Sequence, residues 1–336
     1  MECSVTQFLD SDVAKFAIEA VREASILVRR VQAEMIGEAI TKDDKSPVTV
    51  ADFAAQAIVA RRLAQRFPDA VLVGEESSGG LKDAASQATL QQITRFVQSV
   101  EPAATAENVC EWIDRGSNEA PATYWTLDPV DGTKGFLRKD QYAVALALVK
   151  NGRVVLGALG CPELEEGVRP AKGGAGSILL AMRGEGAWVQ SLAEPHGKWT
   201  RLKASTSGDP AGARLLRSVE KSHTDADSIS DLAEKLGVTA DPVPMDSQAK
   251  YAVLAAGGGD VILRLLSPSR PEYREMIWDQ AAGSIVVEEA GGRVSDLDGK
   301  PLDFSHGRTL ATNRGVLVTN GPLHEAFLAG LKAIGA

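Results

Sequence analysis

The chain is organised around the stretch WTLDPVDGTKGF, residues 125–136. The apolar residues 124–127 predict a buried strand that stops at Asp128. Pro129 then requires a turn, because its ring fixes φ and its nitrogen has no hydrogen to donate to a sheet. Two carboxylates that stand three residues apart, those of Asp128 and Asp131, can therefore converge on one point across this turn.

The residues that follow suit the binding of an anion. Gly132 frees the backbone, and the amides of Gly132 and Thr133 can face an anion at the start of the next turn. Carboxylates beside free amides are what a hard divalent cation needs when it bridges to a phosphate. A plain turn with solvated side chains is the competing interpretation, and only further carboxylates from elsewhere in the chain can decide between the two.

Composition limits the classes of function. The 336 residues, 44% of them apolar, can bury a large core, and we expect two domains, residues 1–203 and 204–336. A net charge of −9 disfavours a nucleic-acid partner. No run reaches the ~18 apolar residues of a membrane span, and residues 1–9 lack the pattern of a secretory signal. The three cysteines are far apart, which indicates reduced thiols. We expect a cytoplasmic monomer without a membrane partner.

Further acidic residues stand where expected elements begin or end. Asp52 follows Thr49 in a capping-box arrangement at the start of an alanine-rich helix. A short apolar strand ends at Glu75 and Glu76, and only one of these two can face a shared site, because neighbouring side chains of an extended chain point in opposite directions. Asp279 opens a later apolar helix. Each acid taken alone is more often a helix cap or a solvated loop residue than a ligand.

The pattern of elements differs between the two halves. An amphipathic helix over residues 10–35 precedes two apolar strands, 142–150 and 153–160, which an Asn-Gly turn joins into a hairpin. The first half is therefore expected to place helices against an antiparallel sheet. From about residue 204, strands and helices alternate, which predicts an α/β layer.

Basic and polar residues gather at element ends in the second half. They stand at residues 221–223, which include His223, between Ser247 and Lys250, and at Arg264. Each cluster alone is more often a solvated face. Together they can clamp a second phosphate, because a phosphate is bound best by arginine, lysine and hydroxyl donors in one place.

The order of these pieces resembles the inositol monophosphatase superfamily of magnesium-dependent, lithium-sensitive phosphatases. The shared pattern is an Asp-Pro-Val-Asp-Gly-Thr stretch, residues 128–133, followed downstream by Trp-Asp and an Ala/Gly-rich helix at residues 278–283. Within the superfamily, residues 132–138, 246–251 and 301–312 resemble the 3′(2′),5′-bisphosphate nucleotidases. The likeness covers nearly the whole chain. It implies an α+β or α/β fold, a layered αβαβα sandwich of the inositol monophosphatase and fructose-1,6-bisphosphatase type.

The resemblance also implies a reaction and a role for individual residues. The 3′-phosphate of adenosine 3′,5′-bisphosphate is expected to be hydrolysed to AMP and phosphate by water that Mg²⁺ activates, with 3′-phosphoadenylyl sulfate as a second substrate. Asp52 and Thr133 are expected to orient and deprotonate this water. Two or three Mg²⁺ ions are expected on four acids and one carbonyl: Glu75, Asp128, Val130, Asp131 and Asp279. Contacts with the substrate are expected from Asp131, Gly132, Thr133, His223, Ser247, Lys250, Arg264 and Asp279.

Three alternatives stay open at this point. The chain can be an inositol polyphosphate 1-phosphatase, since some members of the superfamily accept both substrates. It can be a non-catalytic regulator that binds metal or nucleotide on the same scaffold. In a purely structural interpretation, every acid is only a cap or a turn residue, and the carboxylates do not meet.

Overall fold

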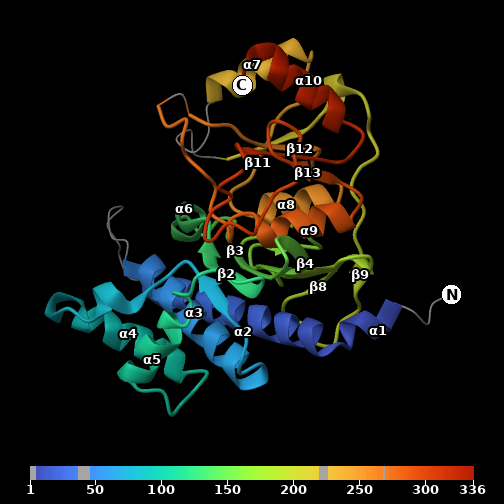
Figure 1. The fold of residues 1–336 in the computed structure, drawn as a ribbon. Coiled ribbons are helices and arrows are strands. Elements are labelled where there is room, and N and C mark those ends of the chain that lie inside the picture. Colours follow the sequence, from blue (N-terminus) through green and yellow to red (C-terminus); the bar gives the residue numbers. More distant parts are fainter. Residues whose placement is uncertain (1–4, 37–45, 219–225, 268) are drawn as a thin grey trace.

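The computed structural model describes residues 5–36, 46–218, 226–267 and 269–336 (Figure 1). Seven strands form one sheet in the order β1-β2-β3-β4-β7-β8-β9, and five form a second sheet in the order β11-β10-β12-β14-β13. The strands of the first sheet are β1 Leu72–Gly74, β2 Thr123–Asp131, β3 Ala143–Lys150, β4 Arg153–Cys161, β7 Ser177–Met182, β8 Gly186–Ser191 and β9 Thr200–Arg201. Those of the second are β10 Leu215–Arg217, β11 Val243–Pro244, β12 Val261–Arg264, β13 Arg293–Ser295 and β14 Val316–Thr319.

Helices cover both sheets and lie between them. The helices are α1 Val5–Leu9, α2 Asp12–Met35, α3 Ser46–Arg66, α4 Gln87–Gln98, α5 Ala106–Asp114, α6 Thr133–Leu137, α7 Ala226–Lys235, α8 Ala249–Ala255, α9 Ala281–Glu289 and α10 His324–Ile334. Short 3₁₀ turns lie at Ser78–Leu81, Ala84–Ser86 and Pro210–Gly212, and a small hairpin pairs β5 Leu164–Glu165 with β6 Arg169–Pro170.

Three hydrophobic clusters separate five layers, which Figure 1 shows stacked from bottom to top. The first cluster joins α2 and α3 to one face of the seven-stranded sheet. The second fills the space between the other face of that sheet, helices α8 and α9, and the five-stranded sheet. The third joins the outer face of the five-stranded sheet to α7 and α10. The layers are therefore helices, sheet, helices, sheet, helices, which confirms the expected αβαβα sandwich.

The sheets are mixed, as their connections require. In the first sheet, β1 runs parallel to β2, and the remaining pairs are antiparallel. The β3–β4 hairpin is confirmed: Asn151 and Gly152 have φ of +49° and +73°, the left-handed pair that a two-residue turn needs. In the second sheet, β10 runs parallel to both β11 and β12. The two sheets fall on either side of residue 204, while the division into two domains at that point stays a prediction.

Three local predictions were wrong. The strand expected to end at Asp128 continues to Asp131, because the chain pairs again with β3 after an irregularity. Helix α3 begins at Ser46, where Pro47 suits a first turn, so Thr49 lies inside the helix and does not cap it. Helix α9 begins at Ala281 with Gln280 as its N-cap residue, so Asp279 lies outside the helix and is not its cap.

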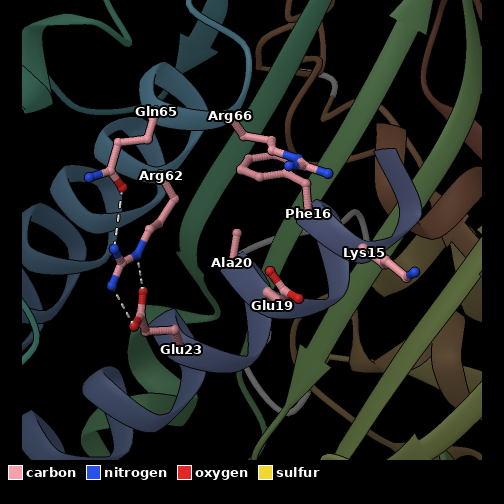
Figure 2. A pocket seen from close by; sticks show the side chains of 8 residues that line it. All are labelled: Lys15, Phe16, Glu19, Ala20, Glu23, Arg62, Gln65 and Arg66. Carbon is pink, nitrogen blue, oxygen red and sulfur yellow. Dashed lines mark hydrogen bonds and ion pairs between the residues drawn. The ribbon is translucent and has the colours of Figure 1, made fainter. Parts of the chain in front are cut away.

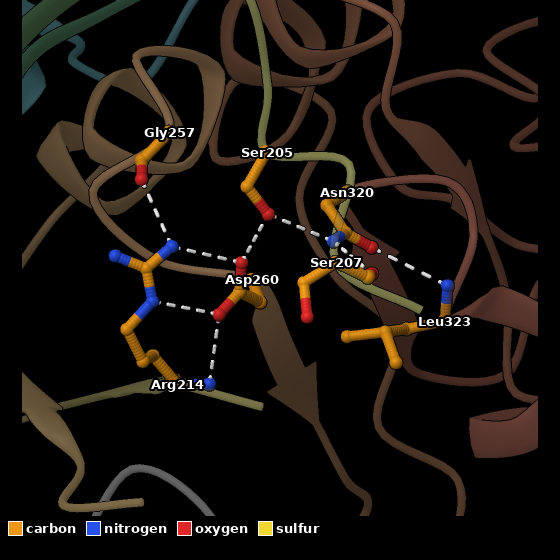
Figure 3. A network of polar contacts seen from close by, with 7 residues as sticks. All are labelled: Ser205, Ser207, Arg214, Gly257, Asp260, Asn320 and Leu323. Carbon is orange, nitrogen blue, oxygen red and sulfur yellow. Dashed lines mark hydrogen bonds and ion pairs between the residues drawn. The ribbon is translucent and has the colours of Figure 1, made fainter. Parts of the chain in front are cut away.

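A network of polar contacts fixes the segment that links the two sheets (Figure 3). Asp260, with 1% of its surface exposed, accepts hydrogen bonds from the Arg214 side chain at 2.8 and 3.0 Å and from the Arg214 backbone N–H at 2.9 Å. It also accepts one from the Ser205 hydroxyl. Asn320 donates to Ser205 Oγ at 2.9 Å and to the Ser207 carbonyl at 2.8 Å. The link therefore has a defined path over the second sheet.

Candidate active site

One cavity, of about 470 Å³, contains most of the predicted site residues. Both halves of the chain contribute to it, from the ends of β1, β2 and β12 and from the segments that precede α8 and α9. The predicted residues that line it are Glu75, Asp128, Val130, Asp131, Gly132, Thr133, Ser247, Lys250, Arg264 and Asp279. His223 lies outside the residues that the structure describes.

A β-bulge in β2 places two of the acids. Asp128 pairs with Ala145 of β3 and Asp131 pairs with Ala143, so three steps along β2 match two along β3. Pro129 cannot donate to the ladder, which explains why the irregularity falls here. The extra residue brings both carboxylates, together with Val130 between them, to the cavity.

Glu75 reaches the same place because β1 lies beside β2. Gly74 pairs with Leu127 in parallel register, so the residue after Gly74 lies next to Asp128. The Glu75 carboxylate repels that of Asp128 and raises its pKa. Glu75 lines the cavity and Glu76 does not, as the alternation along an extended chain predicts.

Asp52 comes from the second turn of α3 and lies near these acids. Burial raises its pKa well above the usual range, and repulsion from Glu75 and Glu76 raises it further. The side chain is not among those that line the cavity. In the part of the chain that the structure describes, no hydrogen bond joins Asp52 to Thr133, and Thr133 is exposed at the cavity wall.

Electrostatic repulsion between the acids raises their pKa values. Burial raises the pKa of Asp128 well above its usual range, and the other four acids, Glu75, Asp131, Asp279 and Asp52, raise it further. Burial, followed by repulsion from Glu76 and Asp131, raises the pKa of Glu75 to about 7. Burial and Asp131 do the same to Asp279, whose pKa is well above its usual range. Acids from four separate segments are thus brought together, which counts against the purely structural interpretation.

A close contact joins Gly132 to the second half of the chain. Gly132 has a φ of +92°, and a Cβ added there would lie 2.7 Å from Ser247 Cβ, so only glycine fits. Ser247 itself adopts a φ of +63°. The next residue, Gln248, donates its backbone N–H to Asp131 Oδ2. This contact opposes the effect of burial, which raises the pKa of Asp131.

Two basic residues, Lys250 and Arg264, also line the cavity and are called its basic end below. Lys250 is only 8% exposed, and burial followed by repulsion from Arg264 lowers its pKa to about 8. Although burial alone would lower the pKa of Arg264, the Glu275 carboxylate raises it above its usual value. Arg264 donates to Glu275 at 2.9 and 3.3 Å. The guanidinium is therefore held in place by a buried carboxylate that sequence reasoning missed.

Other missed residues hold the site together through contacts between segments distant in the sequence. Gln248 donates to the Trp278 carbonyl at 3.0 Å and accepts from the Gly283 N–H at 3.0 Å. Gln280 donates to Glu275 at 2.9 Å and accepts from the Tyr251 hydroxyl. No motif in the sequence indicates these partners, because each contact depends on how the second half folds.

Four acids that line the cavity, called its acidic end below, have the donors that a divalent cation requires: Glu75, Asp128, Asp131 and Asp279. The oxygen Asp128 Oδ1 is buried and has no hydrogen-bond partner in the structure. Buried carboxylates that repel one another need a cation nearby if they are to ionise together. Among the described residues, however, no group of three or more acidic, histidine or cysteine side chains is yet arranged to hold an ion. The residue types and the burial of Asp128 therefore fit magnesium, and a bound ion would need the side chains to move.

A larger cavity, of about 570 Å³, lies between α2 and α3 but lacks this chemistry (Figure 2). Arg62 donates to both carboxylate oxygens of Glu23, at 2.8 and 3.0 Å, and to Gln65 at 3.2 Å. Arg66 in turn pairs with Asp12. The charges on these helices are neutralised locally, so the smaller cavity is the better candidate site.

The model of the inositol monophosphatase family matches residues 9–335. The chain belongs to the inositol monophosphatase family. It is 41% identical to the 3′(2′),5′-bisphosphate nucleotidase of Schizosaccharomyces pombe, with 95% of each chain covered. It is 40% identical to the enzyme of that name from Oryza sativa, over 94% of this chain and 92% of the relative. These relatives confirm the expected superfamily and the classification of the chain as a phosphoric monoester hydrolase.

Solved structures agree on the fold. An inositol monophosphatase from Anabaena superposes with a TM-score of 0.61 at 18% identity, covering 98% of this chain and 96% of that one. SuhB from Mycobacterium tuberculosis gives a TM-score of 0.60 at 21% identity, over 95% and 94% of the two chains. Among the residues of this chain that the structure describes, no helix is long and apolar enough to cross a membrane.

Proposed function

We propose that the chain hydrolyses the 3′-phosphate of adenosine 3′,5′-bisphosphate, giving AMP and phosphate, and that it acts on 3′-phosphoadenylyl sulfate in the same way. The observation that carries the proposal is a single cavity lined both by acids, Asp128 among them, and by the basic residues Lys250 and Arg264. A substrate with two phosphates on one sugar needs both groups, because each phosphate requires its own positive charge. Relatives at 36–41% identity that carry the name bisphosphate nucleotidase support the same choice.

The acidic end would hold Mg²⁺ ions, two or three in number, on Glu75, Asp128, Asp131, Asp279 and the Val130 carbonyl. When bound, these ions supply the positive charge that acidifies a water nucleophile and offsets the charge of the phosphate. The chain's own residues do the rest. Asp52 accepts a proton from the water, with Thr133 directing the water toward phosphorus. The backbone amides of Gly132 and Thr133 donate to the phosphate oxygens during attack.

The basic end would bind the second phosphate and the nucleoside. Lys250 and Arg264 offer cationic donors, and Ser247 offers a hydroxyl. Glu275 fixes the direction of Arg264, so less freedom is lost when a phosphate binds. Tyr273, which also lines the cavity, provides an aromatic surface for the nucleoside. His223 is proposed as a further contact, from the resemblance alone.

A substrate panel tests the proposal. Phosphate release is measured with Mg²⁺ from adenosine 3′,5′-bisphosphate and from inositol 1,4-bisphosphate at equal concentrations. We expect the nucleotide to be preferred by at least tenfold, which corresponds to about 1.4 kcal/mol in transition-state binding. A tenfold preference for the inositide would assign the chain as an inositol polyphosphate 1-phosphatase. Nucleotide binding without turnover at saturating Mg²⁺ would instead indicate a non-catalytic regulator.

The remaining expectations form part of the same proposal. Millimolar lithium added to the panel tests lithium sensitivity. A cytoplasmic, monomeric protein without a nucleic-acid or membrane partner stays a prediction from the composition. Light scattering of the purified protein measures the oligomeric state directly.

A further inference from the structure

Arg308 lies beside the acidic end of the cavity on the loop between β13 and β14. Gly307, with a φ of +82°, turns the chain just before it. The Arg308 carbonyl accepts a hydrogen bond from the Ile277 N–H at 3.1 Å, and Met276 forms an isolated bridge with Thr309. The backbone around Arg308 is therefore paired with the segment that leads into Asp279.

The Arg308 side chain extends from this segment to the end of β1. One terminal nitrogen donates to the Gly74 carbonyl, and the other donates to the carbonyls of Gly116 at 3.2 Å and Asn118 at 3.3 Å. Its guanidinium carbon lies 4.8 Å from the centre of the Trp278 ring. A planar guanidinium can make all these contacts at once, because its donors form a rigid fork and its face stacks on an aromatic ring.

Two of the four groups that the Arg308 side chain contacts are adjacent in sequence to two of the acids. Gly74 directly precedes Glu75, and Trp278 directly precedes Asp279. These acids come from different halves of the chain, 204 positions apart in sequence by subtraction of the residue numbers. The three hydrogen-bond acceptors are neutral carbonyls, and the Arg308 charge acts on the carboxylates of Glu119 and Glu75. It lowers the pKa of Glu75, against the effect of burial.

We propose that Arg308 is a positioning residue of the active site, which sets the spacing between Glu75 and Asp279 and thereby the affinity for Mg²⁺. The inference rests on the proposed function only in assuming that Mg²⁺ binds at the acidic end. Arg308 itself does not line the cavity and is not a ligand. Its effect passes through the backbone of Gly74 and the ring of Trp278.

Calorimetric titration with Mg²⁺ alone, without substrate, tests this role. The variants are Arg308→Met, which removes the fork and the charge, and Arg308→Lys, which keeps only the charge. Arg314→Met serves as the control, because Arg314 lies in the same C-terminal region and pairs with Asp298 at 3.0 Å on the surface. We expect Kd for Mg²⁺ to rise about tenfold in Arg308→Met, since partners that orient metal ligands typically contribute about 10–100-fold. The Kd of Arg308→Lys for Mg²⁺ should lie between those of the wild type and Arg308→Met, and the Kd of Arg314→Met should match the wild type.

Amide hydrogen exchange of metal-free protein gives a second readout that involves neither Mg²⁺ nor turnover. We expect residues 72–78 to exchange faster in both Arg308 variants and unchanged in Arg314→Met. A variant with lower thermal stability but unchanged Mg²⁺ affinity and unchanged exchange at 72–78 would show that Arg308 only packs, and would overturn the inference. If Arg308→Met fails to fold, Arg308→Lys alone decides: Kd within twofold of the wild type overturns the inference.

These outcomes are separable from failure of the proposed function. A wild-type protein that binds Mg²⁺ but does not hydrolyse adenosine 3′,5′-bisphosphate refutes the substrate assignment, while the calorimetric comparison still tests Arg308. A wild-type protein that binds no Mg²⁺ overturns the inference itself.

Discussion

Gln56 holds Glu76 by both ends of its side-chain amide. The Gln56 Nε2 donates to the Glu76 carbonyl at 2.7 Å, and the Gln56 Oε1 accepts from the Glu76 N–H at 3.0 Å. The same Nε2 donates to the Ile113 carbonyl at 2.9 Å. Gln56 is fully buried one helical turn after Asp52, so both side chains lie on the same face of α3. The acidic segment after β1 is thus tied to the helix that carries Asp52.

Gln56→Leu should therefore destabilise the protein. It leaves one N–H and two carbonyls without their buried partner, and we expect a loss of about 2–3 kcal/mol in the free energy of unfolding, measured with urea. Gln65→Leu, on the exposed end of the same helix, is the matched control and should change stability by no more than about 0.5 kcal/mol. Equal losses in the two variants would show that the Gln56 contacts contribute nothing specific.

Asp128→Asn separates the role of the acid in chemistry from its role in the fold. Asparagine keeps the shape and removes the charge on which the four other acids act. We expect kcat to fall by orders of magnitude, and we expect the metal-free variant to be at least as stable as the wild type because repulsion is relieved. Melting in the presence of a chelator measures stability, and Asp69→Asn, on an exposed turn, is the control. Loss of the fold would point to a structural role for Asp128 instead.

The sequence predicted the acids but not how they are supported. Asp128 and Asp131 could be paired in advance because three residues and a proline separate them. That Glu75 lies beside Asp128 follows from the pairing of β1 with β2, some 50 positions apart, which no local pattern specifies. Gln56 and Glu275 were missed for the same reason: a buried glutamine or glutamate shows its purpose only through partners distant in sequence.

Local signals also misled where tertiary contacts decide. Thr49 and Asp52 match a capping box, yet Pro47 lets α3 begin a turn earlier, and the acid then lies within the helix. Asp279 is of a residue type that is common at the N-cap, but it lines the cavity, and Gln280 takes the cap position. In both cases an acid that resembles a cap lies among other acids that raise its pKa.

Magnesium should stabilise the protein more at high pH than at low pH. Burial and mutual repulsion raise the pKa of Glu75 from its ordinary value of 4.5 to about 7 in the folded protein. A group with a raised pKa stabilises the fold below its unfolded pKa, and this stabilisation is lost as pH rises through the folded value. Cations take the place of the lost protons. We expect the difference in Tm between samples with Mg²⁺ and with chelator to grow from about pH 5 to about pH 8.

The Asp128→Asn variant is the internal control for this pH dependence. It lacks an acid that four other acids repel, so its gain in Tm from Mg²⁺ should be small at every pH. A Tm difference in the wild type that is constant or shrinks with rising pH would contradict the view that cations and protons compete at these carboxylates.

Asp260→Ala should be costly, because Arg214 would lose its buried partner (Figure 3). Removing one member of a buried ion pair typically costs about 3–5 kcal/mol, and we expect the lower end because the Arg214 side chain is 38% exposed. Urea unfolding measures the loss. Glu325→Ala, which breaks the exposed pair with Arg293, should cost less than about 1 kcal/mol.

The contribution of Asp260 to stability should depend on pH. Burial alone would raise the pKa of Asp260, but its bonds to Arg214 and Ser205 outweigh burial and leave the pKa below the usual range. The contribution of Asp260 to the free energy of unfolding is therefore present at neutral pH and is lost in acid. Equal effects of the two substitutions at neutral pH would mean that the link between the sheets is held by packing and not by this network.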